Sequence, residues 1–567
     1  MNASSFFKLP GKIGWRDQLI GALLAITYIT WLLATARSLG FPRDEGTYFR
    51  AATRYASWFK LLFEHSSSAM DPRTVDSSWV DNHEHPALMK SLFSLSWMYF
   101  HEKWKVFADA STAMRFPAMV MAGIGCWVTY LFGARAYSRR AGILAALLFA
   151  LMPRVFFQAH LACFDIPITT MWTLCIYVYW RAQQEGGWWR PIIVGLVFGL
   201  TLETKHNAWI LPLVFFPHAM FDFARSLFSS ARPRITRVAI PWSLFWMATL
   251  GPLVFYALWP WMWHDTKPRL EEYANFHLNH EYYNMEFLGR NYFGPPSPRG
   301  YMPLMICATV PAVTLLLFFT GAFETLRIHA ARLVAWVKRV LGRSAAAAID
   351  TKNEVDILFG LAFCAAIAPW LFLPKNPIFG GTKHWMPAYP FLTLFAGRGF
   401  DLVARSLSRA AFALHARSRL AAQAALLACV LAAPLAITIH SHPFGLETYV
   451  PLVGGTPGGA DIGLNRQFWG YTTQSAGAWL AANAPQNATI YIHDTTYDAW
   501  NEMQREGRLR PDLRAVGSPG EAQIALIQHE LHMAEVEYQI WVAFGTTAPA
   551  YIVTDDGVPI VSIYMRP

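Results

Sequence analysis

Two adjacent carboxylates, Asp44 and Glu45, follow the first apolar segment of this 567-residue chain. An acidic pair at the mouth of a membrane span is costly unless it faces water or a polar cavity, so the pair is a candidate functional site. A carboxylate in such a place can act as a general base that takes the proton of an attacking hydroxyl. The structural alternative is an acidic turn at a helix end, suited by Pro42 and Gly46, with Asp44 as the N-cap of the next helix.

Further ionisable side chains stand in the polar breaks between later apolar runs: Glu84, His85, Lys90, Asp165, Lys205, His206, His264, Asp265, Lys383 and His384. A lysine in such a break can hold a phosphate as a point charge, and its structural alternative is a lysine that snorkels to the membrane interface. Asp165 either caps the helix that follows or serves as a second-site carboxylate that orients an acceptor or a metal ion.

Several of these side chains are also types that bind divalent cations: His83, Glu84, His85 and His264. The side chains of Glu84 and His264 are the candidates for a divalent metal ion. The alternative for each is a polar loop residue near the lipid headgroups, so metal binding stays an open question here.

The composition places these residues in a membrane protein. The chain is 54% hydrophobic and 15% charged, whereas soluble domains carry about a quarter charged residues. Apolar runs of about 20 residues recur, which is long enough to cross a bilayer as a helix. The net charge of +10 sits largely in short loops, where it orients the spans. We see no basic, aromatic-interleaved module, so nucleic acid is not an expected partner.

The apolar runs predict a polytopic α-helical protein with about eleven spans. Nine have predicted limits, and the fifth and sixth flank the polar break 203–207: 15–36, 114–137, 141–157, 166–180, 238–261, 301–323, 355–373, 385–400 and 420–439. If the N-terminus is cytoplasmic, successive loops alternate between the two sides of the membrane. The arginine-rich loops then lie inside the cell, as the positive-inside rule requires. The same alternation puts every loop that carries a candidate residue on the outer face.

We therefore divide the chain into a membrane module, residues 1–440, and a soluble tail, residues 441–567. The first external loop, residues 37–109, holds the acidic pair and two amphipathic stretches expected to lie on the membrane surface. The tail is predicted to be a small extracytoplasmic α/β domain. Its expected helices are 476–482 and 530–541, and its expected strands are 489–493, 524–527, 551–554 and 558–564, the last two joined by a hairpin turn at 555–557.

The order and sidedness of the loop motifs resemble the GT-C membrane glycosyltransferases. The resemblance is to the protein O-mannosyltransferases and the bacterial lipid A aminoarabinose transferases, both of glycosyltransferase family 39 type. In that group a His-Pro-Pro-Leu or Lys-Pro-Pro-Leu element follows the acidic pair, and this chain has Ala87 in place of the second proline in 85–88. Segments 162–167, 204–205 and 383–390 resemble three further elements of the group, the first its second acidic site.

The resemblance implies a GT-C fold and an enzyme that passes a hexose or pentose from a polyprenyl-phosphate carrier to an acceptor hydroxyl, with inversion. Asp44 would be the general base, Glu45 would orient Asp44 or bind a cation or substrate, and the three candidate lysines would hold the phosphate. The acceptor would be a protein, a lipid or a glycan. Apart from the sugar donor no cofactor is certain, with a divalent metal ion left open. We prefer a bacterial inner membrane with the tail in the periplasm.

A polytopic transporter or lipid flippase is the alternative function. Two-fold hydropathy repeats and charged residues on both sides of the membrane midplane would favour it. The sequence has no such repeat, and its ionisable residues near span ends gather on one face, apart from the basic loops.

Overall fold

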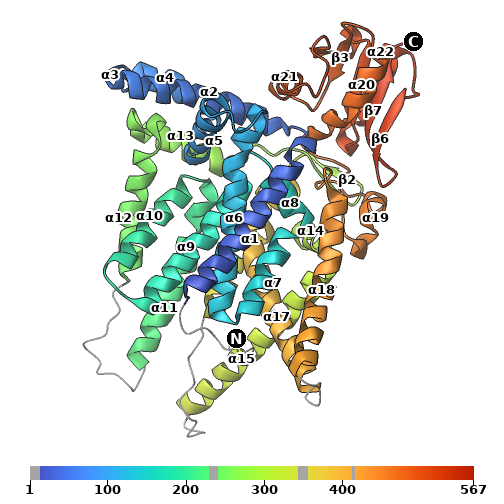
Figure 1. Cartoon of the computed structure of the whole chain (residues 1–567). Helices are drawn as coiled ribbons and strands as arrows, with labels where there is room; N and C mark the ends of the chain where they lie inside the picture. The colour runs from blue at the N-terminus through green and yellow to red at the C-terminus, as the bar shows by residue number, and fades with distance from the viewer. Residues whose placement is uncertain (1–12, 229–240, 342–354, 411–415) are drawn as a thin grey trace.

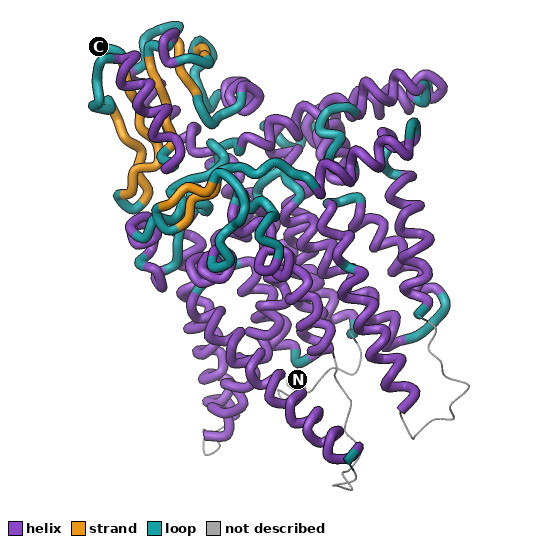
Figure 2. Tube along the Cα trace, turned by 180° about the vertical axis from the view of Figure 1, so that it is seen from behind, coloured by secondary structure: helices purple, strands orange, loops and turns teal. Residues whose placement is uncertain are grey.

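The computed structural model describes residues 13–228, 241–341, 355–410 and 416–567. A bundle of long helices stands beneath a layer of shorter helices, and a mixed β-sheet sits at one end of that layer (Figures 1 and 2). The loops that carry the predicted site residues therefore lie at the same end of the bundle as the C-terminal sheet.

Helices occupy every region in which a span is predicted. The bundle contains α1 (Trp15–Thr35), α6 (Ala110–Ala136), α7 (Arg139–Ala150), α8 (Pro153–Ala159), α9 (Asp165–Glu185), α10 (Trp189–Leu202), α11 (Pro212–Phe228), α12 (Trp242–Ala257), α14 (Tyr301–Thr309), α15 (Ala312–Val340), α16 (Val355–Phe372), α17 (Tyr389–Ala410) and α18 (Ala416–Ser441). The predicted third span is bent by 71° between α7 and α8, where Pro153 starts a new helix in the first-turn position that proline favours.

Among the described residues, fewer helices qualify as complete membrane spans than the sequence predicts. Among the described residues, five helices are long and apolar enough to cross a membrane, or six if the bent pair α7–α8 is one span. Helices α10 and α12 are apolar but shorter, and the predicted eighth span is divided between α14 and α15. The membrane-protein class is therefore supported, while the number eleven stays a prediction.

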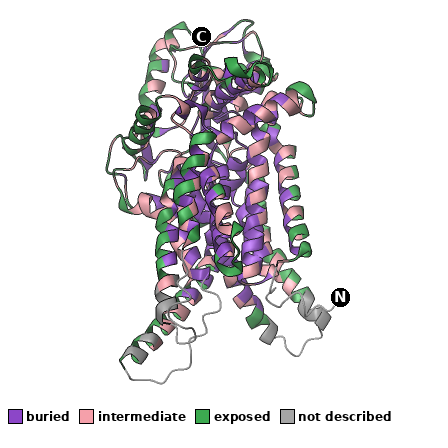
Figure 3. Cartoon of the chain, turned by 90° about the vertical axis from the view of Figure 1, so that its left-hand side faces the viewer, coloured by how far each residue is buried: buried purple, intermediate pink, exposed green. Residues whose placement is uncertain are grey.

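Burial across the bundle agrees with a membrane setting. Buried residues concentrate along the middle of the helices and exposed ones along the outside (Figure 3). Large apolar side chains are exposed on the outer helices, among them Leu23 and Ile26 on α1 and Phe319 and Phe323 on α15. Exposed apolar surface of this extent on helices indicates contact with lipid.

Glycines set the closest helix contacts in the bundle. A Cβ added at Gly195 of α10 would lie 2.5 Å from the backbone oxygen of Trp246 on α12. One added at Gly321 of α15 would lie 1.9 Å from the backbone oxygen of Phe395 on α17. Small residues at helix interfaces permit the close backbone approach on which packing in membranes depends.

The layer above the bundle is built from the first external loop and one later helix. It contains α2 (Arg43–Glu64), α3 (Ser66–Ala69), α4 (Pro72–Trp79), α5 (Leu88–Ser96), a π-helical turn over 97–103, and α13 (Thr266–Leu278). Aromatic contacts hold it together, with the tilted rings of Tyr55 and Trp79 at 3.9 Å between centroids. Because Pro42 precedes the first residue of α2, the acidic pair falls in the first turn of that helix.

The C-terminal tail forms a five-stranded sheet in the order β4-β3-β5-β7-β6. Its strands are β3 (Thr489–Ile492), β4 (Arg514–Val516), β5 (Ile524–Gln528), β6 (Tyr551–Asp555) and β7 (Val558–Met565). Strand β3 pairs in parallel with β4 and β5, whereas β7 is antiparallel to β5 and β6. The predicted hairpin turn is present, with positive φ at Asp556 and Gly557.

The helices of the tail agree in part with the prediction. The first predicted helix corresponds to α20 (Gly477–Asn483), and the second begins later than expected, as α22 (Ala534–Phe544), after a 3₁₀ turn. Strand β4, helices α19 (Gly455–Asp461) and α21 (Tyr497–Arg505), and the hairpin of β1 (Met285–Phe287) with β2 (Arg290–Tyr292) were not predicted. These elements are short, so the sequence pattern within each is weak.

The tail packs directly on the start of α2. The backbone N–H of Arg43 donates to the carbonyl of Trp469 at 2.9 Å, and the Arg43 guanidinium bonds Asp494 at 2.7 Å. A Cβ added at Gly40 would lie 2.0 Å from the backbone oxygen of Tyr471. The C-terminal domain therefore covers the helix end that carries the acidic pair.

Candidate active site

Glu45 is buried in a bidentate ion pair. Arg115 of α6 donates from Nε to Oε1 at 2.8 Å and from Nη2 to Oε2 at 2.6 Å. The backbone N–H of Ala162 donates to Oε1 at 2.7 Å, and Arg115 donates further to the carbonyl of Gly40 at 2.7 Å. The carboxylate thus joins α2 to α6 and to the loop before α9, which is a structural use of the residue predicted to orient Asp44 or bind substrate.

Asp44 is placed quite differently from its neighbour. It is the second residue of α2, whose N-cap is Pro42 without any side-chain cap, so the expected capping alternative is wrong. Within the described part of the chain its half-buried carboxylate makes no hydrogen bond and no ion pair. Burial lowers the pKa of Lys383, and the negative charge of Asp44 opposes that lowering. Burial raises the pKa of Tyr48, and the charge of Asp44 adds to that rise. Asp44 is therefore a carboxylate available to a substrate.

Asp165 and Lys205 form a second charged pair at this end of the bundle. Lys205 Nζ lies 2.6 Å from Asp165 Oδ1, and both side chains are largely buried. Asp165 is the first residue of α9, with Phe164 as the N-cap, so it does not cap that helix. Lys205 follows α10 and precedes a 3₁₀ turn over 206–210. The ammonium that the sequence predicted to bind phosphate is thus already held by a carboxylate.

Of the three candidate lysines, Lys383 is the one without a carboxylate or carbonyl partner among the described residues. Its Nζ lies 3.9 Å from the ring centroid of Trp469, 4.8 Å from that of Phe379 and 5.7 Å from that of Phe468. Among the described residues no carboxylate or carbonyl lies within hydrogen-bonding distance of it. Burial lowers the pKa of Lys383, while the charges of Asp44 and Asp165 raise it. A buried ammonium stabilised by aromatic faces alone is suited to receive an anion.

Imidazoles from four segments of the chain gather near these lysines as a histidine cluster. His206 stacks on His277 at 4.1 Å between centroids, and His277 lies 5.7 Å from His85. His280 and His384 both contact the Phe379 ring, at 5.0 and 4.9 Å. Three of the five, His85, His206 and His384, were predicted for the site. The other two, His277 and His280, were not predicted. They stand three positions apart in the external loop after the span predicted at 238–261, and this spacing is a signal that could have identified them.

Four of these five imidazoles are neutral at neutral pH. Burial, with the neighbouring lysines adding to it, lowers the pKa of His85, His206 and His384 well below its usual value. Burial likewise lowers the pKa of His277 to about 4, and its Nε2 bonds the backbone oxygen of Glu84 at 2.9 Å. Neutral imidazoles offer N–H donors without adding positive charge, so the cation in contact with a bound anion would be Lys383.

Lys90 does not belong to this group. Its ammonium is fully buried and donates to the backbone oxygens of Asn82 and His85, at 2.5 and 2.9 Å. Burial lowers the pKa of Lys90 to about 7. These contacts hold the loop that precedes α5 and use two of the three N–H donors of Lys90. They favour a structural role for Lys90 over the predicted role in binding phosphate.

His264 and Asp265 are also placed away from the cluster. They stand at the start of α13, whereas His277 is in its last turn, about 16 Å further along at 1.5 Å per residue. Glu84 accepts a hydrogen bond from Asn82 at 2.6 Å. In the part of the chain that the structure describes, neither Glu84 nor His264 belongs to a group of three potential metal ligands, so the proposed metal candidates are not supported.

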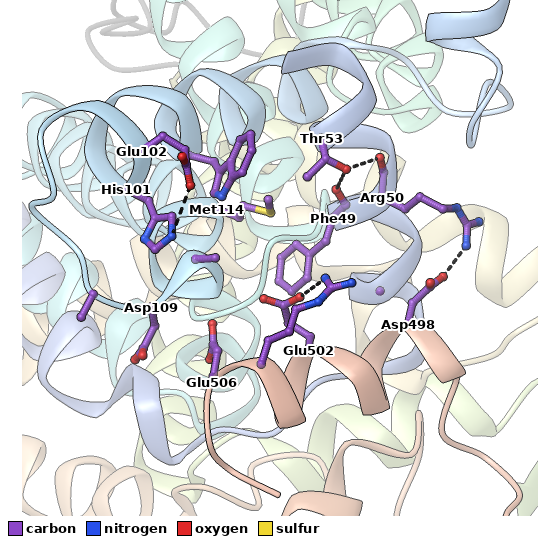
Figure 4. A pocket seen from close by; sticks show the side chains of 15 residues that line it. Phe49, Arg50, Thr53, His101, Glu102, Asp109, Met114, Asp498, Glu502 and Glu506 are labelled. Atoms are coloured by element: carbon purple, nitrogen blue, oxygen red, sulfur yellow. Dashed lines mark hydrogen bonds and ion pairs between the residues drawn. The ribbon is translucent and has the colours of Figure 1, made fainter. Parts of the chain in front are cut away.

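A cavity of about 600 Å³ lies between α2 and the C-terminal domain (Figure 4). Arg50 and Phe49 of α2 line one side, and Asp498 and Glu502 of α21 line the other. Its carboxylates outnumber its guanidinium groups, so it repels a phosphate. None of the predicted site residues lines it, and it is therefore separate from the candidate site.

Comparisons with known proteins were made for the sequence and for the fold. Residues 99–259 match the family model described as dolichyl-phosphate-mannose-protein mannosyltransferase. No curated protein matches the chain.

Several solved structures resemble the chain at low sequence identity. ArnT from Cupriavidus metallidurans, bound to undecaprenyl phosphate, is 14% identical with a TM-score of 0.46, over 96% of this chain and 97% of that one. The oligosaccharyltransferase AglB from Archaeoglobus fulgidus is 12% identical with a TM-score of 0.48, over 94% of this chain and 71% of that one. The family match confirms the resemblance to the membrane glycosyltransferases that the loop motifs indicate.

Proposed function

We propose that this protein transfers a sugar from a polyprenyl-phosphate carrier to an acceptor hydroxyl on the extracytoplasmic side of the bacterial inner membrane. The family match over residues 99–259 supports a glycosyltransferase. The observation that carries the proposal is which charged side chains of the loops have an ion-pair partner and which have none. Asp44 and Lys383 have no polar partner among the described residues, and the charge of Asp44 opposes the lowering of the Lys383 pKa by burial. Their neighbours Glu45 and Lys205 are paired.

The two free groups have complementary tasks in this reaction. The bond between the anomeric carbon and the phosphate oxygen breaks, and a bond to the acceptor oxygen forms on the opposite face, which inverts the configuration. The acceptor proton passes to the carboxylate of Asp44 as general base. The phosphate leaves as an anion, and Lys383 stabilises the developing charge from a site shielded by aromatic rings.

The paired residues have positioning roles in the proposal. Asp165 holds Lys205, and Lys205 adds positive charge near the phosphate without being its principal contact. Glu45 fixes the first turn of α2 through Arg115, so that Asp44 is presented at a constant position. The imidazoles of the histidine cluster supply N–H donors to the phosphate or the sugar. The acceptor is a protein, a lipid or a glycan.

The test is transfer by the purified protein in liposomes, with a radiolabelled sugar on polyprenyl phosphate and a mixture of acceptors from a bacterial envelope. We expect label to move to an acceptor and expect Asp44→Asn to abolish that movement. If labelled lipid crossed the bilayer without any sugar transfer, the protein would be a flippase, which is the alternative function.

A further inference from the structure

Three side chains with metal-binding atoms meet where the C-terminal domain contacts a loop of the membrane module. Glu286 lies on β1, and Glu530 and His532 lie between β5 and α22. Their ligand atoms all lie within 4.8 Å of one another. His532 Nδ1 is 3.4 Å from Glu286 Oε1 and 3.4 Å from Glu530 Oε2. Glu286 is more than 240 positions away from Glu530 and His532 in sequence, so only the fold brings it to the other two.

The spacing of these atoms suits one small cation. Nitrogen and oxygen ligands of zinc lie about 2.0–2.1 Å from the metal, so two ligands of a tetrahedral site are about 3.3–3.4 Å apart. The two distances from His532 have this length. Two carboxylates and one imidazole leave a fourth position for water, and imidazole among the ligands favours zinc over magnesium or calcium.

The electrostatics of the surroundings provide a second, independent argument. The side chains of Glu286 and Glu530 are only 6% and 5% exposed. Asp494 is equally buried, and its Oδ2 has no hydrogen-bond partner among the described residues. In the part of the chain that the structure describes, Arg43 is the arginine or lysine that bonds this set, through Asp494 Oδ1. Three buried carboxylates facing one guanidinium need further positive charge, because buried charges without a partner are costly.

The ligands are also oriented by neighbouring groups. Glu530 Oε1 accepts a hydrogen bond from the amide of Gln467, which leaves Oε2 directed at His532. The backbone N–H of His532 donates to Glu286 Oε1 at 3.2 Å. Contacts of this kind hold metal ligands in place in known sites.

We propose that Glu286, Glu530 and His532 bind a divalent zinc-type ion that clamps the C-terminal domain onto the β1–β2 hairpin. The ion links the membrane module to the domain that supplies Trp469 and Asp494. It is distinct from the sequence candidates Glu84 and His264, and it does not depend on the proposed glycosyl transfer.

The experiment measures zinc in the full-length protein in detergent. The purified protein is incubated with Zn²⁺, freed of excess ion, and assayed for metal by mass spectrometry, and its thermal midpoint is recorded with and without EDTA. We expect about one zinc per chain and a lower midpoint in EDTA. Glu286→Gln and His532→Ala should weaken zinc binding by at least about 100-fold, since even residues that only support ligands cost 10–100-fold.

His529→Ala is the matched control. His529 lies in the same segment but bonds Ser562 of β7 at 2.8 Å instead of the cluster, so its replacement should leave zinc binding intact. Absence of zinc from the wild-type protein, with a midpoint unchanged by EDTA, would overturn the proposal without requiring any variant to fold. Equal zinc binding by His532→Ala and the wild type would overturn it as well.

Discussion

The ammonium of Lys383 lies 3.9 Å from the ring centroid of Trp469. Lys383 belongs to a loop of the membrane module, and Trp469 belongs to the C-terminal tail. Trp469 has a φ of +79°, a left-handed conformation that a bulky residue adopts only when its surroundings hold it there. Its carbonyl accepts the backbone N–H of Arg43, next to Asp44. The tail thus fixes both free groups of the candidate site.

Asp44→Asn should separate catalysis from structure. Asparagine keeps the size of the side chain but is not a base, and loss of a general base costs roughly 10²–10⁴-fold in rate. Because Asp44 makes no hydrogen bond within the described residues, we expect an unchanged thermal midpoint and near-normal donor binding. The measurement is the turnover of purified protein with saturating donor.

Asp71→Asn is the control for that variant. Asp71 is a true N-cap that accepts hydrogen bonds from the backbone of Arg73 and Thr74, and asparagine caps as well as aspartate. Its turnover should equal that of the wild type. A turnover of Asp44→Asn within a few-fold of the wild type would exclude Asp44 as the base.

Lys383 and Trp469 should act as a unit in donor binding. Lys383→Ala should weaken binding of the polyprenyl-phosphate donor by about one to two decades, since a hydrogen bond to a charged group contributes about 1.5–3 kcal/mol. Trp469→Ala should weaken it by a comparable factor, because a desolvated cation–π contact contributes about 2 kcal/mol.

A double-mutant cycle checks whether the two effects share one cause. If Trp469 works by placing the ammonium, the double variant should bind donor no more weakly than Lys383→Ala alone. Donor dissociation constants for the four proteins provide the comparison. Strictly additive losses would mean that Trp469 contacts the donor independently of Lys383.

Glu45→Gln should affect stability rather than chemistry. The change leaves the buried guanidinium of Arg115 without its counter-ion, and breaking such a pair costs about 3–5 kcal/mol. We expect a clearly lower thermal midpoint, in contrast to Asp44→Asn. Glu64→Gln is the control, because Glu64 is exposed near the end of the same helix. An unchanged midpoint of Glu45→Gln would mean that the pair contributes nothing net.

The lowered pKa of the buried Lys90 ammonium should make the stability of the protein depend on pH. Burial lowers the pKa of Lys90 to about 7 from 10.5, so between these values the unfolded chain binds the extra proton and the folded chain does not. The contribution of Lys90 to the free energy of unfolding should therefore rise with pH from about 7 to about 10.5.

Lys90→Met removes this titration while keeping most of the aliphatic stem. The thermal midpoint of the variant minus that of the wild type should decrease steadily as the pH is raised from 7 to 10. The absolute difference also contains the loss of hydrogen bonds to Asn82 and His85, so only its slope is diagnostic. A difference that is constant over this range would show that Lys90 is not titrating there.

The sequence by itself determined the features that depend on local pattern. Apolar runs located the helices of the bundle, because hydrophobic length is a property of a continuous segment. Alternating apolar residues around 555–557 located the hairpin of β6 and β7 for a similar reason. Polar breaks containing Asp44, Lys205 and Lys383 marked one end of the bundle as the candidate site.

Only the tertiary structure decided which of those residues is free to react. Asp44 and Glu45 are neighbours of nearly equal chemistry, and what separates them is Arg115, 70 positions away. Lys90, Lys205 and Lys383 look alike in sequence, but backbone carbonyls hold the first, Asp165 holds the second, and aromatic rings from the tail surround the third. Whether a buried charged side chain has a partner depends on residues far away in the sequence. Tertiary packing brings those residues together, and a local sequence pattern does not contain that information.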